Sequence, residues 1–486
     1  MNRITSKRCR LGTIVLALPF LAACASTQRT LPSARPADAT AATAAYMEKI
    51  RNDPNALLLF IRQMPKGGDI HSHLGGAVYA ESYIRWAEED GLCLIRATLS
   101  LSPPPCEERD GKIPAADITR NPDLYGDVID AWSMRNWHPA QKNGHDQFFE
   151  SFSKFGTQDH RIGDMLAEVT TRAASQNVTY LELMFGPDRG RAIRLGISTG
   201  ADAELGRMRE RLIEAGLRDS LGIARRKIDD FERRQRTLMG CDSLPQLPAC
   251  NVVVRYLYQV LRGLPPEAVF AQILAGFEMA TADSRFVGFN LVMPEDHPVP
   301  MRDFSLHMRM IDFLHALYPG VKITLHAGEL AEGLVPPEGM RFHIRESIGP
   351  GHASRIGHGT AVLHEDDPRG LLREMAERKI LVEVSLASSD GILGIRGKRH
   401  PLTTYLAHGV PVALATDDEG VSRTSLTHEF RKAVEEQELD YITIKAMARN
   451  SIAYAFVEDG TKARLLAELD DAFTRFEAYH AGLQKN

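Results

Sequence analysis

The stretch Met64-Pro65-Lys66-Gly67-Gly68-Asp69-Ile70-His71-Ser72-His73-Leu74 places two histidines, one residue apart, at the end of an expected β-strand. Side chains at positions i and i+2 of a strand point to the same side. His71 and His73 can therefore bind one metal ion while Ser72 faces away. Paired histidines also occur as core or loop residues, so the spacing alone leaves both interpretations open.

Four later stretches carry a titratable group at or near the end of a short apolar run. They are Leu325-His326-Ala327-Gly328-Glu329, Arg355-Ile356-Gly357-His358-Gly359, Val382-Glu383-Val384 and Ala415-Thr416-Asp417-Asp418. An isolated histidine is usually a core residue, and an aspartate pair is often a helix cap. Their recurrence at several strand ends favours a shared metal site instead.

Alternating apolar runs and helical segments predict the fold class. With the His-x-His stretch, eight runs are typical of buried strands; the other seven are 178–185, 252–258, 286–292, 321–326, 354–358, 380–386 and 410–416. Continuous apolar strands between helices predict a parallel sheet covered by helices. Eight such units predict an α/β fold, a closed (β/α)8 TIM-type barrel with its site at the carboxyl ends of the strands. We expect long inserts after the first and second strands (87–147 and 186–250) and closing helices over 422–484.

Composition is that of an ordinary globular protein. The 486 residues are 44% hydrophobic and 25% charged, and the net charge is −5. The charged run over 207–236 mixes both signs, as on a solvated helix face, so we expect no nucleic-acid surface. Length alone would allow two or three domains, but a barrel with inserts predicts a single domain over 45–486.

The N-terminus is typical of an export signal. Basic residues precede an apolar run over 11–21 that is too short for a permanent membrane span. Leu21-Ala22-Ala23-Cys24 resembles a bacterial lipobox, in which cleavage precedes Cys24 and the cysteine is lipidated. We expect a signal peptide over 1–23, a flexible tether over 24–44, and a periplasmic or cell-envelope lipoprotein that contacts the membrane through this lipid alone. An ordinary signal peptide with a nearby cysteine is the alternative.

Four further cysteines form two local pairs. Cys93 with Cys106 and Cys241 with Cys250 each enclose a proline-containing loop. An oxidising periplasm would permit a disulfide within each pair, and four free structural thiols are the alternative. Neither pair has the Cys-x-x-Cys spacing of a zinc knuckle.

The titratable groups at the strand ends suit a catalytic zinc ion, which prefers nitrogen and oxygen ligands and keeps one position open. The expected ligands are His71, His73, His326 and Asp417. A water would complete the coordination, and its pKa would fall towards neutrality. Nickel, cobalt and iron accept similar ligands and stay open.

Three further residues have expected roles beside the metal. Glu329 lies three residues beyond His326 and can face a substrate without being a ligand. His358 could hold or deprotonate the water, and Asp418 could hydrogen-bond the substrate or the water. We expect one ion, because two-metal barrel hydrolases commonly use a bridging lysine at the end of the fourth strand, and this strand ends in Asn290-Leu291-Val292-Met293.

The motifs, in this order, closely resemble those of the adenosine deaminase family of metal-dependent barrel hydrolases. The resemblance is carried by Met64-Pro65-Lys66 with His71-Ser72-His73, His326-Ala327-Gly328-Glu329, His358-Gly359 and Thr416-Asp417-Asp418, and more weakly by Phe152 with Phe155 and by Asn450-Ser451-Ile452. It spans roughly residues 60–480. The export signal and the enlarged insert after the first strand are similar to the secreted, growth-factor-type branch.

The resemblance implies hydrolytic deamination of adenosine, or of a closely related 6-aminopurine nucleoside, to inosine and ammonia. It assigns zinc binding to His71, His73, His326 and Asp417. Glu329 would protonate purine N1, His358 would orient and deprotonate the attacking water, and Asp418 would contact N7. His73 would also border the substrate.

Two departures from the family pattern lie around the substrate. The fourth strand of the family usually ends Asp-Leu-x-Gly, and its glycine contacts the purine; here Met293 either contacts the substrate or fills the barrel mouth. The seventh strand continues into Ser385-Leu386-Ala387-Ser388-Ser389-Asp390 where the family has Cys-Pro-x-Ser-Asn. A related hydrolase acting on a modified adenine derivative or an amide is therefore one alternative. A non-enzymatic purine-binding lipoprotein is another, although Glu329 argues against it.

Overall fold

Eight parallel strands form one sheet in the computed structural model, which describes residues 36–156 and 159–483. In spatial order they are β1 (Gly67–His73), β5 (Val178–Phe185), β6 (Val253–Leu261), β7 (Phe286–Val292), β8 (Lys322–Ala327), β9 (Arg355–His358), β10 (Leu381–Val384) and β11 (Val412–Leu414). Each neighbouring pair is parallel, and spatial order follows chain order. This arrangement confirms the predicted barrel.

The barrel closes where β1 meets the segment that follows β11. An isolated parallel bridge pairs Ser72 with Asp417. The amide of Asp417 donates to the carbonyl of His71 (3.0 Å), and the amide of His73 donates to the carbonyl of Asp417 (2.8 Å). The hydroxyl of Thr416 donates to the Asp69 carboxylate at 2.6 Å. The first and last strands are therefore joined through the same residues that carry predicted metal ligands.

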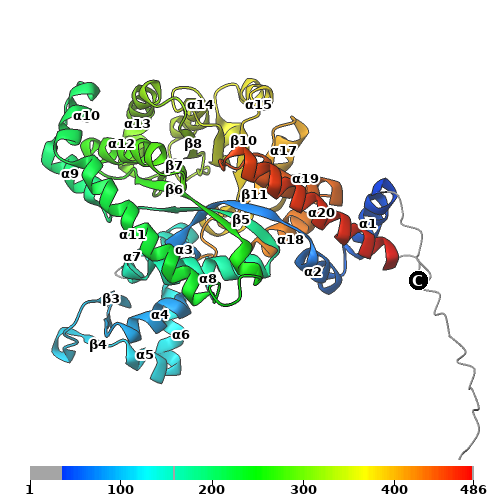
Figure 1. Ribbon diagram of the computed structural model, residues 1–486, viewed down its shortest axis with the longest axis horizontal. Helices are drawn as coiled ribbons and strands as arrows, with labels where there is room; N and C mark the ends of the chain where they lie inside the picture. The colour runs from blue at the N-terminus through cyan, green and yellow to red at the C-terminus, as the bar shows by residue number, and fades with distance from the viewer. Residues whose placement is uncertain (1–35, 157–158, 484–486) are drawn as a thin grey trace, which may run out of the picture.

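Helices cover the outer face of the barrel (Figure 1). Those that follow the barrel strands are α8 (Ile162–Ser175), α12 (Pro266–Ala282), α13 (Pro298–Leu317), α14 (His343–Ile348), α15 (Pro368–Glu377), α16 (Leu386–Leu393) and α17 (Leu402–Ala407). The closing helices are α18 (Leu426–Glu436), α19 (Tyr441–Ala453) and α20 (Asp459–Leu483). In α12, twelve consecutive residues from Ala268 to Met279 are buried, as expected of a helix covered on both sides.

Both predicted inserts are present. The first is longer than the predicted 87–147 and occupies 74–155. It contains α3 (Leu74–Ala77), α4 (Ala80–Glu89), α5 (Ala116–Arg120), α6 (Pro122–Ala131) and α7 (Gly144–Phe155), with a small antiparallel sheet of β2 (Cys93–Ile95), β3 (Ser100–Ser102) and β4 (Lys112–Pro114). The second contains α9 (Arg191–Thr199), α10 (Leu205–Glu214) and α11 (Leu217–Leu238). Disulfides join Cys93 to Cys106 and Cys241 to Cys250, which confirms both predicted pairs.

The tether predicted over 24–44 is wrong from residue 36 onward. α1 (Pro36–Ile50) packs along α20 (Figure 1), and α2 (Pro54–Gln63) follows after the N-cap Asp53. Alanine is the strongest helix former, and burial of Ala39 and Met47 fixes the helix against its neighbour. The predicted signal peptide and the predicted lipidation site, Cys24, lie outside the described residues. Within the described part of the chain, no helix is both long and apolar enough to cross a bilayer.

Candidate metal and catalytic site

Four predicted ligand atoms converge at the carboxyl ends of β1 and β8 and just beyond β11. Nε2 of His71 lies 3.1 Å from Nε2 of His326 and 3.4 Å from Oδ1 of Asp417. Nε2 of His73 lies 3.2 Å from Nε2 of His326 and 3.3 Å from Oδ1 of Asp417. Ligands bound at about 2.0–2.2 Å from one zinc ion stand roughly 3–3.5 Å apart. Oδ1 of Asp417 is buried and accepts no hydrogen bond, as fits an oxygen that binds a cation.

The other ring nitrogen of each histidine faces an acceptor on another strand of the barrel. The pairs are His71 with Glu383 (2.6 Å), His326 with Asn290 (2.9 Å) and His73 with Gln259 (3.3 Å). A proton on Nδ1, held by such an acceptor, leaves the Nε2 lone pair free and fixes the orientation of the ring. These three acceptors are functional residues that the sequence analysis left without a role.

Glu383 belongs to a charged layer inside the barrel. It lies in the apolar strand β10 and is fully buried. Its other oxygen accepts from the hydroxyl of Thr324 (2.9 Å) and lies 2.6 Å from Nε of Arg355. Burial opposes ionisation, but the charge of Arg355 and the bond from His71 outweigh it and lower the pKa of Glu383. Val382-Glu383-Val384 was among the stretches noted in the sequence, and the structure adds the partner of Glu383, which is His71.

Three residues at the strand ends adopt the left-handed backbone conformation. They are Met293 (φ 88°), His358 (φ 67°) and Asp417 (φ 60°). Side chains other than glycine rarely accept this conformation, and such strain concentrates at functional sites. Gly357 is required for a different reason, because a Cβ there would lie 2.6 Å from Cε1 of His71.

His358 stands next to the ligand atoms. One of its ring nitrogens lies within 4.8 Å of the ligand atoms of His71, His326 and Asp417, so it could also contribute to a metal site. Both ring nitrogens are buried without a hydrogen-bond partner. Burial lowers the pKa of His358 to about 4, which keeps the ring neutral and able to accept a proton.

Glu329 faces the same cavity from the end of β8. Its Oε1 lies 3.7 Å from Nε2 of His358. Burial, reinforced by the negative charges of Asp417 and Glu295, raises the pKa of Glu329 well above its usual value. A raised pKa favours the protonated form of the carboxyl group, which is the form that can act as an acid.

Asp418 points into the cavity beside Asp417. Its Oδ1 is buried without a partner. Burial raises the pKa of Asp418 well above its usual value, and the charge of Asp417 adds to the effect. Gly76 makes room for this side chain, because a Cβ at that position would overlap Oδ1 of Asp418.

A cavity of about 420 Å³ opens above these groups. It is lined by the predicted residues His73, Met293, His326, Glu329, Asp417 and Asp418, and by Gly75, Gly76, Phe148, Phe149, Phe152, Gln259, Leu261, Val292, Pro294 and His297. Most of the added side chains are apolar, and neither lysine nor arginine is among them. The three phenylalanines come from α7 in the first insert, so the insert forms one wall of the site.

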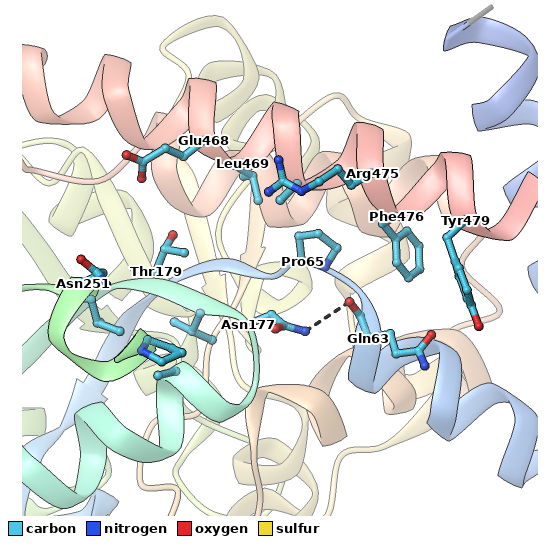
Figure 2. Close-up of a pocket in the computed structure, with 15 residues that line it drawn as sticks. Gln63, Pro65, Asn177, Thr179, Asn251, Glu468, Leu469, Arg475, Phe476 and Tyr479 are labelled. Atoms are coloured by element: carbon cyan, nitrogen blue, oxygen red, sulfur yellow. Dashed lines mark hydrogen bonds between the residues drawn. The ribbon is translucent and has the colours of Figure 1, made fainter. Parts of the chain in front are cut away.

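A larger hollow of about 750 Å³ lies at the opposite end of the barrel (Figure 2). Residues at the amino ends of β1, β5 and β6, such as Pro65 and Asn177, form one side of it, and Phe476 and Tyr479 of α20 form the other. Histidine and cysteine are absent from its lining, and its one carboxylate belongs to Glu468. The ligand set and the acid therefore lie at the 420 Å³ cavity alone.

Comparisons with known proteins agree with this geometry. The family model described as adenosine deaminase matches residues 145–472, well over half of the chain. An adenine deaminase of Rhizobium leguminosarum bv. trifolii is 28% identical over 328 residues, which cover 66% of this chain and 84% of that protein. An adenosine deaminase of Shewanella loihica is 34% identical over 149 residues, which cover 30% of this chain and 42% of that protein.

Solved structures share the barrel. A zinc-bound amidohydrolase of Burkholderia ambifaria aligns with a TM-score of 0.55 at 18% identity, covering 88% of this chain and 95% of that one. The N6-methyl-AMP deaminase of Arabidopsis thaliana aligns with a TM-score of 0.53 at 21% identity, covering 85% and 98%. With the family match, the fold and the metal-ligand set in place, the chain belongs to the adenosine deaminase family of metal-dependent hydrolytic deaminases.

Proposed function

We propose that the protein removes the 6-amino group of adenosine, or of a closely related 6-aminopurine nucleoside, to give inosine and ammonia. One observation carries the proposal: Glu329, a buried acid with a raised pKa, faces the same cavity as the four converging ligand atoms. A site that only bound a purine would need no such acid beside a metal.

One Zn²⁺ held by His71, His73, His326 and Asp417 is the proposed cofactor. The mutual spacings of the four ligand atoms and the unpartnered oxygen of Asp417 support it. When bound, the ion would lower the pKa of a water molecule and make hydroxide available near neutral pH.

The side chains around the cavity supply the remaining chemistry. Glu329 donates a proton to purine N1, which makes C6 electrophilic; such a transfer is typically worth ~10²–10⁴-fold in rate. His358 is neutral and unpartnered, so it can orient the water and take its proton. Asp418, with its raised pKa, can donate a hydrogen bond to N7.

The cavity lining supports a neutral substrate. Phosphate recognition usually requires arginine or lysine, and the lining contains neither. Its volume of about 420 Å³ leaves room beyond a purine ring for a sugar. An adenine deaminase among the relatives and an N6-methyl-AMP deaminase among the structural neighbours keep adenine and modified adenine derivatives as the second candidates.

A substrate screen of the metal-loaded protein tests the proposal. Adenosine, 2′-deoxyadenosine, adenine, AMP and N6-methyl-AMP are compared by loss of the adenine absorbance band and by release of ammonia. We expect the highest kcat/KM with a nucleoside and the lowest with the nucleotides. A preference for N6-methyl-AMP, or no turnover of any aminopurine, would contradict the proposal.

We also propose export and anchoring through a lipid on Cys24. The lipobox-like tetrapeptide supports this, and so do two disulfides, which persist mainly in oxidising compartments. Mass spectrometry of the mature N-terminus should find a lipidated Cys24. The variant Cys24→Ser should release the protein from the membrane fraction, whereas an intact Met1 would contradict export.

A further inference from the structure

The carboxylate of Glu295 lies behind Glu329 and takes no part in the steps above. Glu295 lies in the loop between β7 and α13, and its side chain is wholly excluded from solvent. One oxygen accepts the backbone N–H of Gly328 (3.0 Å), and the other accepts that of Glu329 (2.8 Å). Both oxygens of one carboxylate therefore hold two consecutive residues of the acid-bearing loop.

This loop needs such an acceptor because β8 has already ended. The strand stops at Ala327, and Gly328 turns away from it with φ +74°. A side chain at Gly328 would lie 2.8 Å from Cδ1 of Ile344, so the turn is tightly enclosed. A buried N–H group without an acceptor destabilises the fold, because it has lost its hydrogen bond to water and gained none in return. Glu295 provides the acceptors that a neighbouring strand would otherwise provide.

Glu295 is itself held by a histidine and an arginine. Nδ1 of His343 donates to Oε1 at 2.5 Å, and Nη2 of Arg262 lies 4.0 Å from Oε2. Arg262 also donates to the carbonyls of Met293 (3.1 Å) and His326 (2.9 Å). Burial opposes ionisation of Glu295, but the bond from His343 and the charges of His343 and Arg262 outweigh it and hold its pKa at about 2. The carboxylate therefore stays ionised, and Arg262 connects it to the ends of β6, β7 and β8.

We infer that Glu295 is a positioning residue for Glu329: by fixing the backbone of Gly328 and Glu329, it holds the Glu329 carboxyl within reach of the purine ring. The inference rests on the proposed function, because it assumes that Glu329 delivers a proton to the substrate. Misplacing a reacting group by about 1 Å can cost ~10²-fold in rate.

The variant Glu295→Gln tests the inference against the matched control Glu365→Gln. Glu365 is also buried and accepts a backbone N–H, that of Ile344 at 2.6 Å, but it contacts neither Gly328 nor Glu329. In Glu295→Gln an NH₂ group replaces one accepting oxygen, so one of the two N–H groups loses its partner. We expect kcat to fall ~10²-fold with KM and metal content nearly unchanged, and Glu365→Gln to keep the parental kcat.

A double-mutant cycle separates positioning from general damage. Because Glu295 acts through Glu329, adding Glu295→Gln to Glu329→Gln should cause no further loss of kcat. If the fold-losses in kcat of the two single variants instead multiplied in the double variant, the inference would be overturned. Loss of the metal from Glu295→Gln would overturn it as well, since the damage would then lie at the ligands.

Hydrogen exchange gives a readout that does not need turnover. Amides in the peptide spanning 326–332 should exchange faster in Glu295→Gln than in the parent, and Glu365→Gln should leave that peptide unchanged. If these amides exchanged equally fast in Glu295→Gln and in the parent, the inference would be overturned, even though the parent deaminates its substrate. A parent that deaminates no aminopurine would overturn the proposed function, and with it the role of Glu295, whatever the exchange shows.

Discussion

The metal side and the substrate side of this site are built from different kinds of structure. Each imidazole of the metal side stands near a strand end and faces an acceptor on another strand: Glu383, Asn290 or Gln259. The substrate side is walled by Phe148, Phe149 and Phe152 of the first insert and by the loop residue Met293. From this difference we expect the strands to determine metal binding, and the first insert and Met293 to determine which substrate fits. Changes on the metal side should affect every substrate, and changes on the substrate side should affect substrates unequally.

Removing a ligand should have the largest effect. His326→Ala removes an Nε2 atom that lies 3.1 Å and 3.2 Å from the corresponding atoms of His71 and His73. We expect both the metal and all turnover to be lost, as measured by elemental analysis and ammonia release. His352→Ala, which changes a partly exposed histidine bonded to Asp312, should retain both. Full metal occupancy in His326→Ala would show that the ligand set is wrong.

Removing the acid Glu329 should have the second-largest effect. Glu329→Gln keeps the shape of the side chain but cannot supply the proton, so kcat should fall ~10²–10⁴-fold while metal content stays at the parental level. Turnover of each accepted substrate and metal content are measured on the same preparation. Parental activity in this variant would assign the proton donor to another residue.

An intermediate effect is expected one layer behind the ligands. Glu383→Gln weakens the acceptor that orients His71, and such changes typically lower metal affinity about 10–100-fold. Competition with a chelator measures the metal affinity of the variant and of the parent. Glu182→Gln is the control, because Glu182 is equally buried and pairs with Arg355 at 2.5 Å but contacts no histidine ligand. Equal affinity losses in both variants would mean that the barrel interior, and not the orientation of His71, sets affinity.

The smallest effect is expected on the substrate side. Met293→Gly removes a side chain from the cavity lining and relieves its positive φ of 88°. We expect KM to change by a few-fold, and unequally for adenosine and N6-methyladenosine, while metal content is unchanged. Lys379→Gly relieves similar strain (φ 55°) at an exposed site and should leave the kinetics unaltered. An equal change for all substrates would mean that Met293 only fills the barrel mouth.

The difference between the barrel strands and the insert and loops also decides how much of the structure could be predicted from the sequence. The runs 178–185 and 286–292 match β5 and β7 residue for residue, because strands buried on both faces are continuously apolar. The small sheet of the first insert was missed, because strands of three residues are too short to show a period. Glu295 and Gln259 look like ordinary polar residues in the sequence, and their roles arise only when distant strands become neighbours. The wall formed by α7 depends in the same way on long-range packing.

The closure between β1 and the segment after β11 has a consequence for synthesis. Asp417 is both a proposed ligand and the bridge partner of Ser72, so the ligand set spans nearly the full length of the barrel sequence. At translation rates of about 5–20 residues per second, the ribosome needs roughly 20–70 s after making His71 to reach Asp417. Throughout that interval the first strand has no partner on one side. A nascent chain therefore cannot assemble the full ligand set until the last strand has left the ribosome.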